Sequence, residues 1–487
     1  MSTARENMVS GIFYTAIAKY SGVVVSLVVT AILARILTSE DFGIVAVATI
    51  IIAFFSMISD MGIAPAIIQN KQLDNEDLNN IFSFTIWSGI AFMLIFIASA
   101  WGIASYYKSE ILIPICHILS VNLFFSSANI VPNALLQKNK RFKFIGIRSL
   151  SVQIAGGTAA VVAALSGAGL YALLINPVFS SISLFFINYS QYKMRAKFTF
   201  GWTSLKKIFG YSAYQLGFNV INYFSRNLDK LLMGRHLGMS ELGYYEKSYR
   251  LMMYPLQLIP NVVSPVMHPI FSEMQDDLKK LSDSYLEIVK ILAFIGFPLS
   301  VFLVCTSSEL ILLLFGNQWE PSVSVFQILS ITVSLQIILS TSGAIFQASN
   351  STKALFWCGG ITAAINIIAI CIGVWGFETI DAIAWCISTS FTLNFIITYY
   401  IMYYKVFRLP WRPFWKELGS PVLLSIIMLA VMLPISYFLP EDFNIILSFI
   451  IKIVAAFTVY FCFLKFTGIY DLKKGFLILI NKAKNML

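Results

Sequence analysis

The sequence predicts an all-α integral membrane protein of about fourteen transmembrane helices, and three observations predict it. Of the 487 residues, 58% are hydrophobic and 12% are charged, and the mean hydropathy is +0.78. Soluble domains carry about 25% charged residues, so much of the apolar surface must face lipid. The apolar runs are too long for barrel strands and do not alternate with polar residues. The cations gather in alternate loops.

Short polar or glycine-containing turns separate the apolar runs, as at Ser39–Asp41 and at Gly316–Asn317. The first run is too long for a cleaved signal peptide, so we expect it to remain as a transmembrane helix. The predicted spans are 10–36, 43–68, 80–105, 110–136, 145–166, 169–192, 207–236, 242–270, 284–307, 320–348, 354–376, 379–404, 416–437 and 443–465.

The loop charges predict the orientation. The odd-numbered loops are short and poor in cations, whereas the even-numbered loops hold most of the Lys and Arg residues. Since cytoplasmic loops are enriched in these residues, both ends of the chain are predicted to be cytoplasmic. The same distribution argues against a nucleic-acid partner, despite a net charge of +10, because no basic stripe lies on one soluble domain. The basic loop residues are Lys138, Lys140, Arg141 and Lys143, then Lys193, Arg195, Lys197, Lys206 and Lys207, then Lys405, Arg408, Arg412 and Lys416, and the C-terminal tail adds Lys473, Lys474, Lys482 and Lys484.

Two echoes predict an internal repeat of six helices. The pattern R-x-L-x-x-x-[DE]-[FL]-G occurs at 35–43 and at 235–243, and A-[LI]-[LF]-Q occurs at 134–137 and 344–347. A repeat with an even number of helices is parallel, and parallel halves are one plan for transporters. The predicted parts are a first lobe at 1–200, a second lobe at 201–405, two extra helices at 406–466 and a basic tail at 467–487. The tail is either an amphipathic helix on the inner membrane surface or a solvated segment.

The first repeated motif is interpreted as structural. Acidic residues at the starts of helices suit the helix dipole, and glycine permits close packing of two helices. The residues so interpreted are Arg35, Glu40, Gly43, Arg235, Glu241 and Gly243.

A charged cluster on the seventh and eighth spans is the candidate substrate site. Ionised side chains at the centre of a bilayer are costly and usually functional. Two interpretations stay open: Arg226–Asp229 and Glu246–Arg250 are ion pairs within each helix, or surplus cations meet an anionic substrate. The cluster consists of Arg226, Asp229 and Lys230 on one helix face, with Glu246, Lys247 and Arg250 on the next helix.

The first lobe has fewer intramembrane charges. Lys19 lies in the first span and is grouped with the candidate cavity cations, and Asp60 lies in the second. Asp60 either carries a coupling Na⁺ or H⁺, or pairs with Lys19 or a neighbouring amide. Lys290 and Lys452 are expected to extend their stems toward the interface. No metal or other cofactor site is predicted, and the six cysteines are interpreted as small apolar residues.

Four segments carry a resemblance to a known family: ILARILTSEDFGIVAVATI, ISDMGIAPAIIQ, NLDKLLMGRHLGMSELGYYEKSYRLMMYP and LLLFGNQWEPS. They resemble the polysaccharide-transporter branch of the multidrug/oligosaccharidyl-lipid/polysaccharide (MOP) exporter superfamily, most closely the colanic-acid exporter type of Wzx flippase. This resemblance implies two six-helix lobes in a V with two added helices. It also implies a bacterial inner-membrane protein that moves undecaprenyl-diphosphate-linked sugar repeat units to the outer leaflet. The implied partners are the lipid-linked glycan, membrane lipid, and a polysaccharide polymerase with its export machinery.

Three other functions are weighed against this one. A flippase for the peptidoglycan lipid precursor would share the diphosphate headgroup. A drug or cation antiporter would want an anionic cavity, which the cation surplus disfavours. An outer-face polysaccharide polymerase or ligase would need a large outer loop with catalytic groups, and the sequence shows no such motif. We therefore expect a transporter and not an enzyme.

Overall fold

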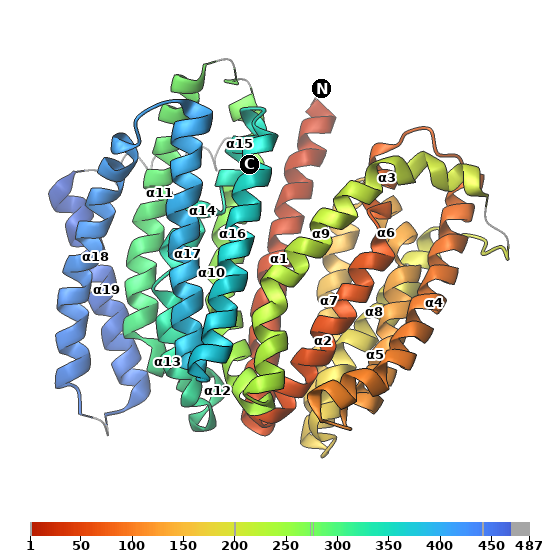
Figure 1. Ribbon diagram of the computed structural model, residues 1–487, viewed down its shortest axis with the longest axis horizontal. Coiled ribbons are helices and arrows are strands. Elements are labelled where there is room, and N and C mark those ends of the chain that lie inside the picture. The colour runs from red at the N-terminus through yellow and green to blue at the C-terminus, as the bar shows by residue number, and fades with distance from the viewer. Residues whose placement is uncertain (1, 199–200, 273, 276, 441–442, 469–487) are drawn as a thin grey trace. The chain divides into compact units, whose positions relative to one another are not determined.

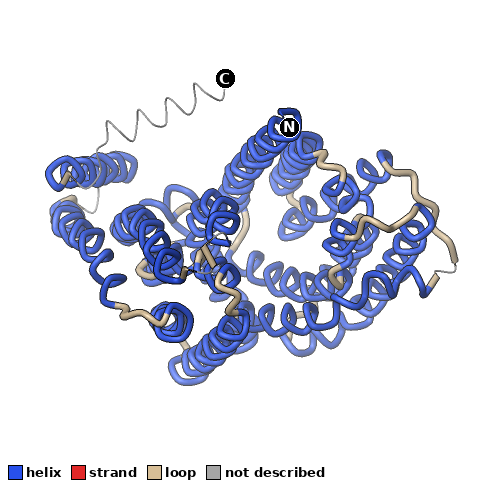
Figure 2. The backbone as a smooth tube through the Cα atoms, turned by 90° about the horizontal axis from the view of Figure 1, so that it is seen from above, coloured by secondary structure: helices blue, strands red, loops and turns tan. Residues whose placement is uncertain are grey.

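The computed structural model describes residues 2–198, 201–272, 274–275, 277–440 and 443–468. Within its helices, side chains are described except at 2–16, 202–203, 207–219, 221, 260–270, 272 and 352. All but the first two residues of the predicted tail, 467–487, lie outside this range. Every regular element in the described residues is a helix, as Figure 2 shows, which confirms the all-α class.

The chain divides into two compact units, Met1–Glu246 and Lys247–Leu487. This division does not test the predicted lobe boundaries, which stay a prediction. α10 (Met239–Ser272) begins in the first unit and continues into the second. The other helices of the first unit are α1 (Ser2–Ile36), α2 (Ser39–Asp60), α3 (Ile63–Gln69), α4 (Asn75–Tyr107), α5 (Leu112–Ala128), α6 (Ile130–Lys138), α7 (Phe142–Leu165), η1 (Gly169–Tyr171), α8 (Ala172–Gln191) and α9 (Trp202–His236).

In the first unit, α1 packs against α7, and α5 packs against α2, α4 and α8 (Figure 1). The second unit is organised around α11, which packs against α14 and α18, while α16 packs against α17. Its helices are α11 (Leu278–Cys305), α12 (Ser307–Phe315), η2 (Asn317–Trp319), α13 (Pro321–Ser330), α14 (Val333–Leu339), α15 (Ser342–Ala348), α16 (Thr352–Ile372), η3 (Gly373–Phe377), α17 (Ile380–Ile401), η4 (Met402–Phe407), α18 (Arg412–Phe438) and α19 (Ile445–Thr467).

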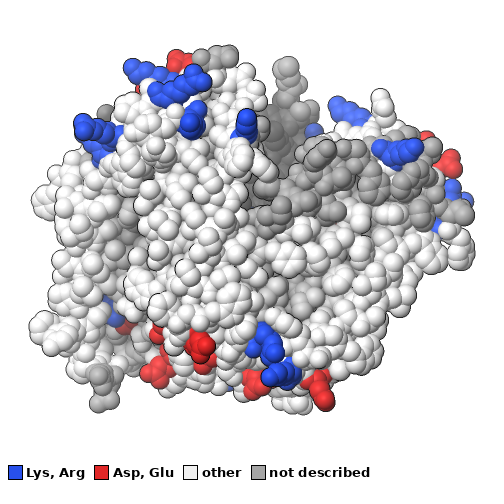
Figure 3. Space-filling model, in the orientation of Figure 1, with Lys and Arg blue, Asp and Glu red and all other residues white. Residues whose placement is uncertain are grey.

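Eleven helices in the described residues are long and apolar enough to cross a membrane. A twelfth results if Pro321–Ser330 and Val333–Ala348, which meet at 46°, form one bent span. The charged helices α9 and α10 are not in this count, and the predicted number of fourteen is not confirmed. On the face seen in Figure 3, charged side chains lie near the ends of helices, with a wide uncharged band between them. This distribution is typical of a protein embedded in lipid.

Several spans are broken. α2 gives way to α3 at Met61 and Gly62, both of which have left-handed backbone angles. α5 gives way to α6 at Asn129. α13, α14 and α15 follow one another with short breaks after Ser330 and after Leu339. Interrupted helices expose backbone groups that must be satisfied by side chains, so they often mark sites in transporters.

The repeated turn motif forms a reciprocal contact within the first unit. A Cβ atom added to Gly43 would lie 1.8 Å from the carbonyl oxygen of Met239, and one added to Gly243 would lie 1.9 Å from that of Ser39. Asp41 closes a capping box with Thr38 at the start of α2. The structural interpretation of the motif is confirmed at these glycines, which allow two backbones to touch.

Candidate functional site

The hairpin of α9 and α10 carries the charged cluster. α9 ends at a turn in which Gly238 has φ 103° and donates its N–H to the carbonyl of Met233 at 3.2 Å. α9 is held to neighbouring helices because Tyr223 donates to the carbonyl of Ile50 and Tyr107 donates to the carbonyl of Leu231. These two hydrogen bonds position the part of α9 that carries Arg226, Asp229 and Lys230 within the first unit.

The two acids of the cluster are bound across the hairpin. Lys230 Nζ lies 2.6 Å from Glu246 Oε2, and both side chains are largely buried. Tyr245 donates its hydroxyl proton to Asp229 Oδ2 at 2.8 Å, and Asp229 is only 4% exposed. The pairs within single helices that the sequence suggested, Arg226–Asp229 and Glu246–Arg250, are not formed.

The two arginines of the cluster have no acidic partner among the described residues. Arg226 and Arg250 are exposed, and neither forms an ion pair with a described residue. Lys247 is 2% exposed, and its Nζ lies 5.6 Å from the ring centroids of both Phe315 and Trp319. Its charge is thus stabilised by aromatic faces. The two exposed arginines lie in different units, Arg226 in the first and Arg250 in the second.

The first-lobe candidates lie apart from this cluster. Lys19 is exposed on α1 and forms no ion pair with Asp60. Asp60 is half-buried at the break between α2 and α3, and no described cation forms an ion pair with it. Its role in ion coupling stays a prediction.

Two lysines have partners that the sequence did not indicate. Lys290 pairs with Glu417 at 2.9 Å. Lys452 forms an ion pair with Glu309 and donates to the carbonyl of Cys305 at 2.9 Å. Lys452 is 5% exposed, so the expectation that its stem extends to the interface is wrong. The acid that neutralises it lies 143 positions away on another helix, beyond the reach of spacing rules.

A buried arginine was missed. Arg148 on α7 is 7% exposed, and its guanidinium donates to Asn188 Oδ1 and, at 2.7 Å, to Asn133 Oδ1. Asn188 in turn donates to Asn129 Oδ1 at 2.7 Å. One sequence signal points to it: no Asp or Glu occurs between Glu110 and Asp229.

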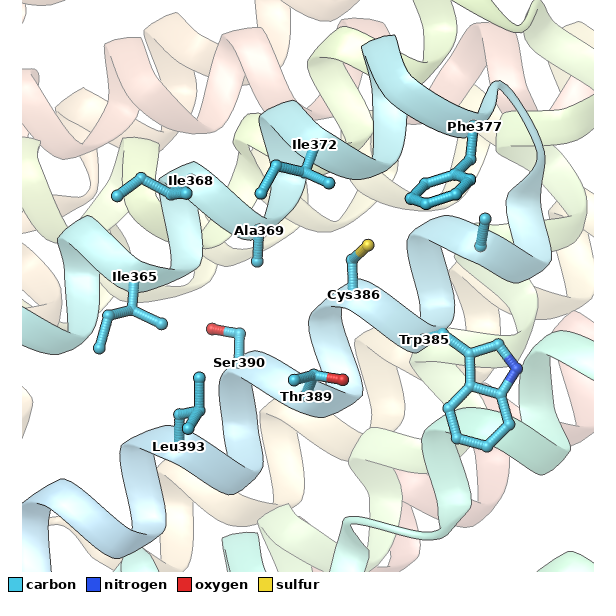
Figure 4. A pocket seen from close by; sticks show the side chains of 11 residues that line it. Ile365, Ile368, Ala369, Ile372, Phe377, Trp385, Cys386, Thr389, Ser390 and Leu393 are labelled. Atoms are coloured by element: carbon cyan, nitrogen blue, oxygen red, sulfur yellow. The ribbon is translucent and has the colours of Figure 1, made fainter.

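A groove on the second unit is apolar. Its volume is about 660 Å³, and it lies between α16 and α17 (Figure 4). Aliphatic and aromatic side chains line most of it, and Thr389 and Ser390 add two hydroxyls. No charged residue lines this groove, so it does not match the predicted cationic site. Among the described residues, no cluster of His, Cys, Asp and Glu has the arrangement of a metal site.

Comparison with known proteins identifies the family. The model of the "Polysaccharide biosynthesis protein" family matches residues 32–324, more than half of the chain. The chain is 27% identical to the lipopolysaccharide biosynthesis protein WzxC of Escherichia coli, over 76% of this chain and 75% of that protein. It is 25% identical to the teichuronic acid biosynthesis protein TuaB of Bacillus subtilis (74% and 75% covered). It is 24% identical to the succinoglycan biosynthesis transport protein ExoT of Rhizobium meliloti (74% of each).

Solved structures show the same fold. The lipid II flippase MurJ in an inward closed conformation matches with a TM-score of 0.73 at 16% identity, over 92% of this chain and 97% of that chain. An inward-facing multidrug transporter of the MOP superfamily matches with a TM-score of 0.60 at 13% identity, over 86% and 99%. The predictions of a MOP-type fold and of a protein that is not an enzyme are confirmed. The chain belongs to the polysaccharide biosynthesis protein family and has the fold of the MOP transporters.

Proposed function

We propose that the protein is a flippase that moves undecaprenyl-diphosphate-linked oligosaccharide repeat units across the bacterial inner membrane, from the cytoplasmic to the outer leaflet. Its relatives support the substrate class, because they are named for the biosynthesis of lipopolysaccharide, teichuronic acid and succinoglycan. One of them is named a transport protein.

The observation that carries the proposal is the uncompensated positive charge on the α9–α10 hairpin. Glu246 forms its ion pair with Lys230, and Asp229 accepts a hydrogen bond from Tyr245. Neither acid therefore forms an ion pair with Arg226 or Arg250. Arginine binds phosphate through two parallel N–H donors and stays charged at any physiological pH. A diphosphate headgroup suits side chains of this kind, whereas a cationic drug would be repelled.

The physical task is to bring a polar headgroup through hydrocarbon. An unsatisfied polar group costs about 2–7 kcal/mol when it leaves water, so a glycan with a diphosphate does not cross lipid unaided. In the proposed cycle the headgroup follows a hydrated, cationic path inside the protein while the polyprenyl tail stays in lipid. Alternating access of the two parallel repeats then moves it between leaflets.

The charge distribution within the second unit supports the proposed orientation. The loop between α17 and α18 carries Arg408 and is followed by Arg412, whereas the loop between α16 and α17 carries Glu378 and is followed by Asp381. Since cations favour the cytoplasmic side, the α17–α18 loop is assigned there, and with it the two chain ends. Coupling to Na⁺ or H⁺ through Asp60 stays a prediction.

The test is complementation of a strain that lacks its own Wzx-type flippase, with surface polysaccharide as the readout. Arg226→Gln and Arg250→Gln should each lower export about tenfold or more, as expected for the loss of a charge-assisted hydrogen bond. Arg412→Gln is the matched control, because Arg412 is an exposed arginine at the start of α18. Full export by both hairpin variants would contradict the role of the surplus charge.

A second strain addresses the rival lipid substrate. MurJ, the lipid II flippase, shares the fold. If the chain restores growth to cells depleted of their peptidoglycan-precursor flippase but exports no polysaccharide, the proposed substrate is wrong.

A further inference from the structure

Arg148 is a buried cation without a neutralising acid. Its Nη1 and Nη2 groups donate to the amide oxygens of Asn188 and Asn133, and it forms no ion pair with a described residue. Neutral amides satisfy hydrogen bonds but leave the charge in place. A buried charge is normally paired, because desolvation of an unpaired ion is costly.

The chain around Arg148 is free of acids over a long stretch. The segment from Ile111 to Leu228 contains no Asp or Glu, and it includes all of α5, α6, α7 and α8. Two other cations near the start of α7 also have neutral hydrogen-bond partners. Lys138 donates to the carbonyl of Asn70 at 2.7 Å, and Arg141 donates to Gln191 Oε1 at 2.8 Å. These four helices therefore supply no acid that could neutralise Arg148.

Three N–H groups of the Arg148 hydrogen-bond network have no acceptor among the described residues. Arg148 Nε is buried and has no hydrogen-bond partner in the described part of the protein. Asn133 and Asn129 use their oxygens to accept from Arg148 and Asn188, and their Nδ2 groups donate to no described residue. Both asparagines are half-buried, so these donors are reachable from the surface. N–H groups of this kind and a guanidinium charge are the donor types that bind an oxyanion.

The second repeat contains a segment equivalent to the one around Arg148, so the two can be compared. α7 begins at Phe142 and α16 begins at Thr352, 210 positions later. The turns before them match at the same offset, since Lys140 has φ 54° and Asn350 has φ 52°. The second echo, at 134–137 and 344–347, has this offset as well. The two segments are therefore structurally equivalent.

At that offset Arg148 corresponds to Cys358, and Asn188 corresponds to Thr398. Cys358 Sγ and Thr398 Oγ1 lie 3.2 Å apart in a buried contact. The second repeat thus joins the same two helices with a small neutral pair. Since a neutral pair suffices for packing, the charge of Arg148 exceeds what the fold requires, and an intramembrane charge of this kind indicates a function.

We propose that Arg148, with Asn129 and Asn133, is a binding site for a phosphate ester of a membrane-anchored molecule. The inference rests on the proposed function, and it assigns this site, as a contact additional to Arg226 and Arg250, to the diphosphate of the lipid-linked glycan. Arg148 lies less than two turns inside α7, about 9 Å from the helix start at 1.5 Å per residue. This depth suits a phosphate whose lipid tail remains in the bilayer.

The experiment measures binding of farnesyl diphosphate to the purified full-length protein in nanodiscs. The decisive variant is Arg148→Cys combined with Asn188→Thr, which copies the neutral pair of the second repeat. It should fold, because the second repeat packs with that pair, and it should bind the probe about tenfold to a hundredfold more weakly. Cys358→Ala is the matched control and should bind like the wild type. Unchanged binding by the double variant would overturn the site.

Asn133→Asp keeps the test decisive if the double variant does not fold. A carboxylate beside Arg148 pairs the buried charge, so this variant should be at least as thermally stable as the wild type and should lose the probe. If it keeps binding, the arginine is only structural and the inference is wrong.

Two further arms separate the sources of the phosphate and the two proposals. Phosphatidylglycerol added to the nanodiscs should compete weakly; if it displaces farnesyl diphosphate fully, the site is a general phospholipid site and its assignment to the substrate is overturned. Polysaccharide export by the wild-type chain in the flippase-null strain tests the proposed function by itself. Wild-type export with unchanged binding by the Arg148 variants would remove this site alone, whereas absence of wild-type export would remove the function and the assignment resting on it.

Discussion

Gly43 and Gly243, which are equivalent in the internal repeat, each face a backbone carbonyl of the other's helix turn. A Cβ atom at either position would lie only 1.8 or 1.9 Å from that carbonyl oxygen, which leaves no room for a side chain. The contact joins the start of α2 to the start of α10, so it also positions the hairpin that carries the charged cluster.

Replacement of either glycine by alanine should therefore lower stability. The added methyl group meets backbone, which cannot move aside as a flexible side chain can, and overpacking of this kind costs about 1–3 kcal/mol. Thermal unfolding in detergent measures the effect. Gly102→Ala on α4 is the control, because nothing lies within 4 Å of its added Cβ. It should stabilise slightly, since alanine is the better helix former by about 1 kcal/mol. Equal melting temperatures for all three variants would contradict the close contact.

The buried pair of Lys452 and Glu309 joins α19 to α12. Each of these residues is 5% exposed, and Ser448 also donates to Glu309 at 2.7 Å. Lys452→Met should destabilise the protein by about 3–5 kcal/mol, because it leaves a buried carboxylate without its counter-ion. Adding Glu309→Gln to Lys452→Met should restore most of this loss.

A double-mutant cycle by thermal unfolding measures the coupling of this pair. Lys290→Met is the matched single control, since Lys290 pairs with Glu417 near the surface and both side chains are about one-third exposed. Its effect should stay below about 1 kcal/mol. Additive effects of Lys452→Met and Glu309→Gln would show that the buried pair contributes no coupling.

The hydroxyl of Tyr245 is the partner of Asp229. Tyr245→Phe should destabilise the protein by about 1–3 kcal/mol, because a buried carboxylate oxygen loses its donor. Asp229→Asn in the same background should recover part of the loss, since a neutral amide is less costly to bury than an ion. The melting temperatures of the single and double variants give the answer, and a double variant less stable than Tyr245→Phe would contradict the assigned role.

The starts of helices could be predicted well from local sequence. The acids at the beginning of α2 were expected to suit the helix dipole, and Asp41 forms a capping box there with Thr38. Such signals act over three or four residues, so they can be recognised in the sequence without knowledge of the tertiary structure. The close packing of Gly43 and Gly243 followed from the repeat.

The partners of the charged residues could not be predicted in this way. Spacing rules apply only to neighbours on one helix. They suggested Arg226 as the partner of Asp229 and Arg250 as the partner of Glu246. In the structure Tyr245 contacts Asp229 and Lys230 contacts Glu246, because the rotation of α10 against α9 decides which side chains meet. Arg148 was missed for the same reason, since its partners come from α6 and α8.

By itself, the sequence determined the membrane class, the helical architecture, the repeat and the family. These depend on hydropathy and on short local patterns, which are additive along the chain. Only the tertiary structure decided which buried charges are neutralised and which keep their charge. That outcome depends on how neighbouring helices are rotated and shifted against each other, and this register is set by packing of the whole bundle.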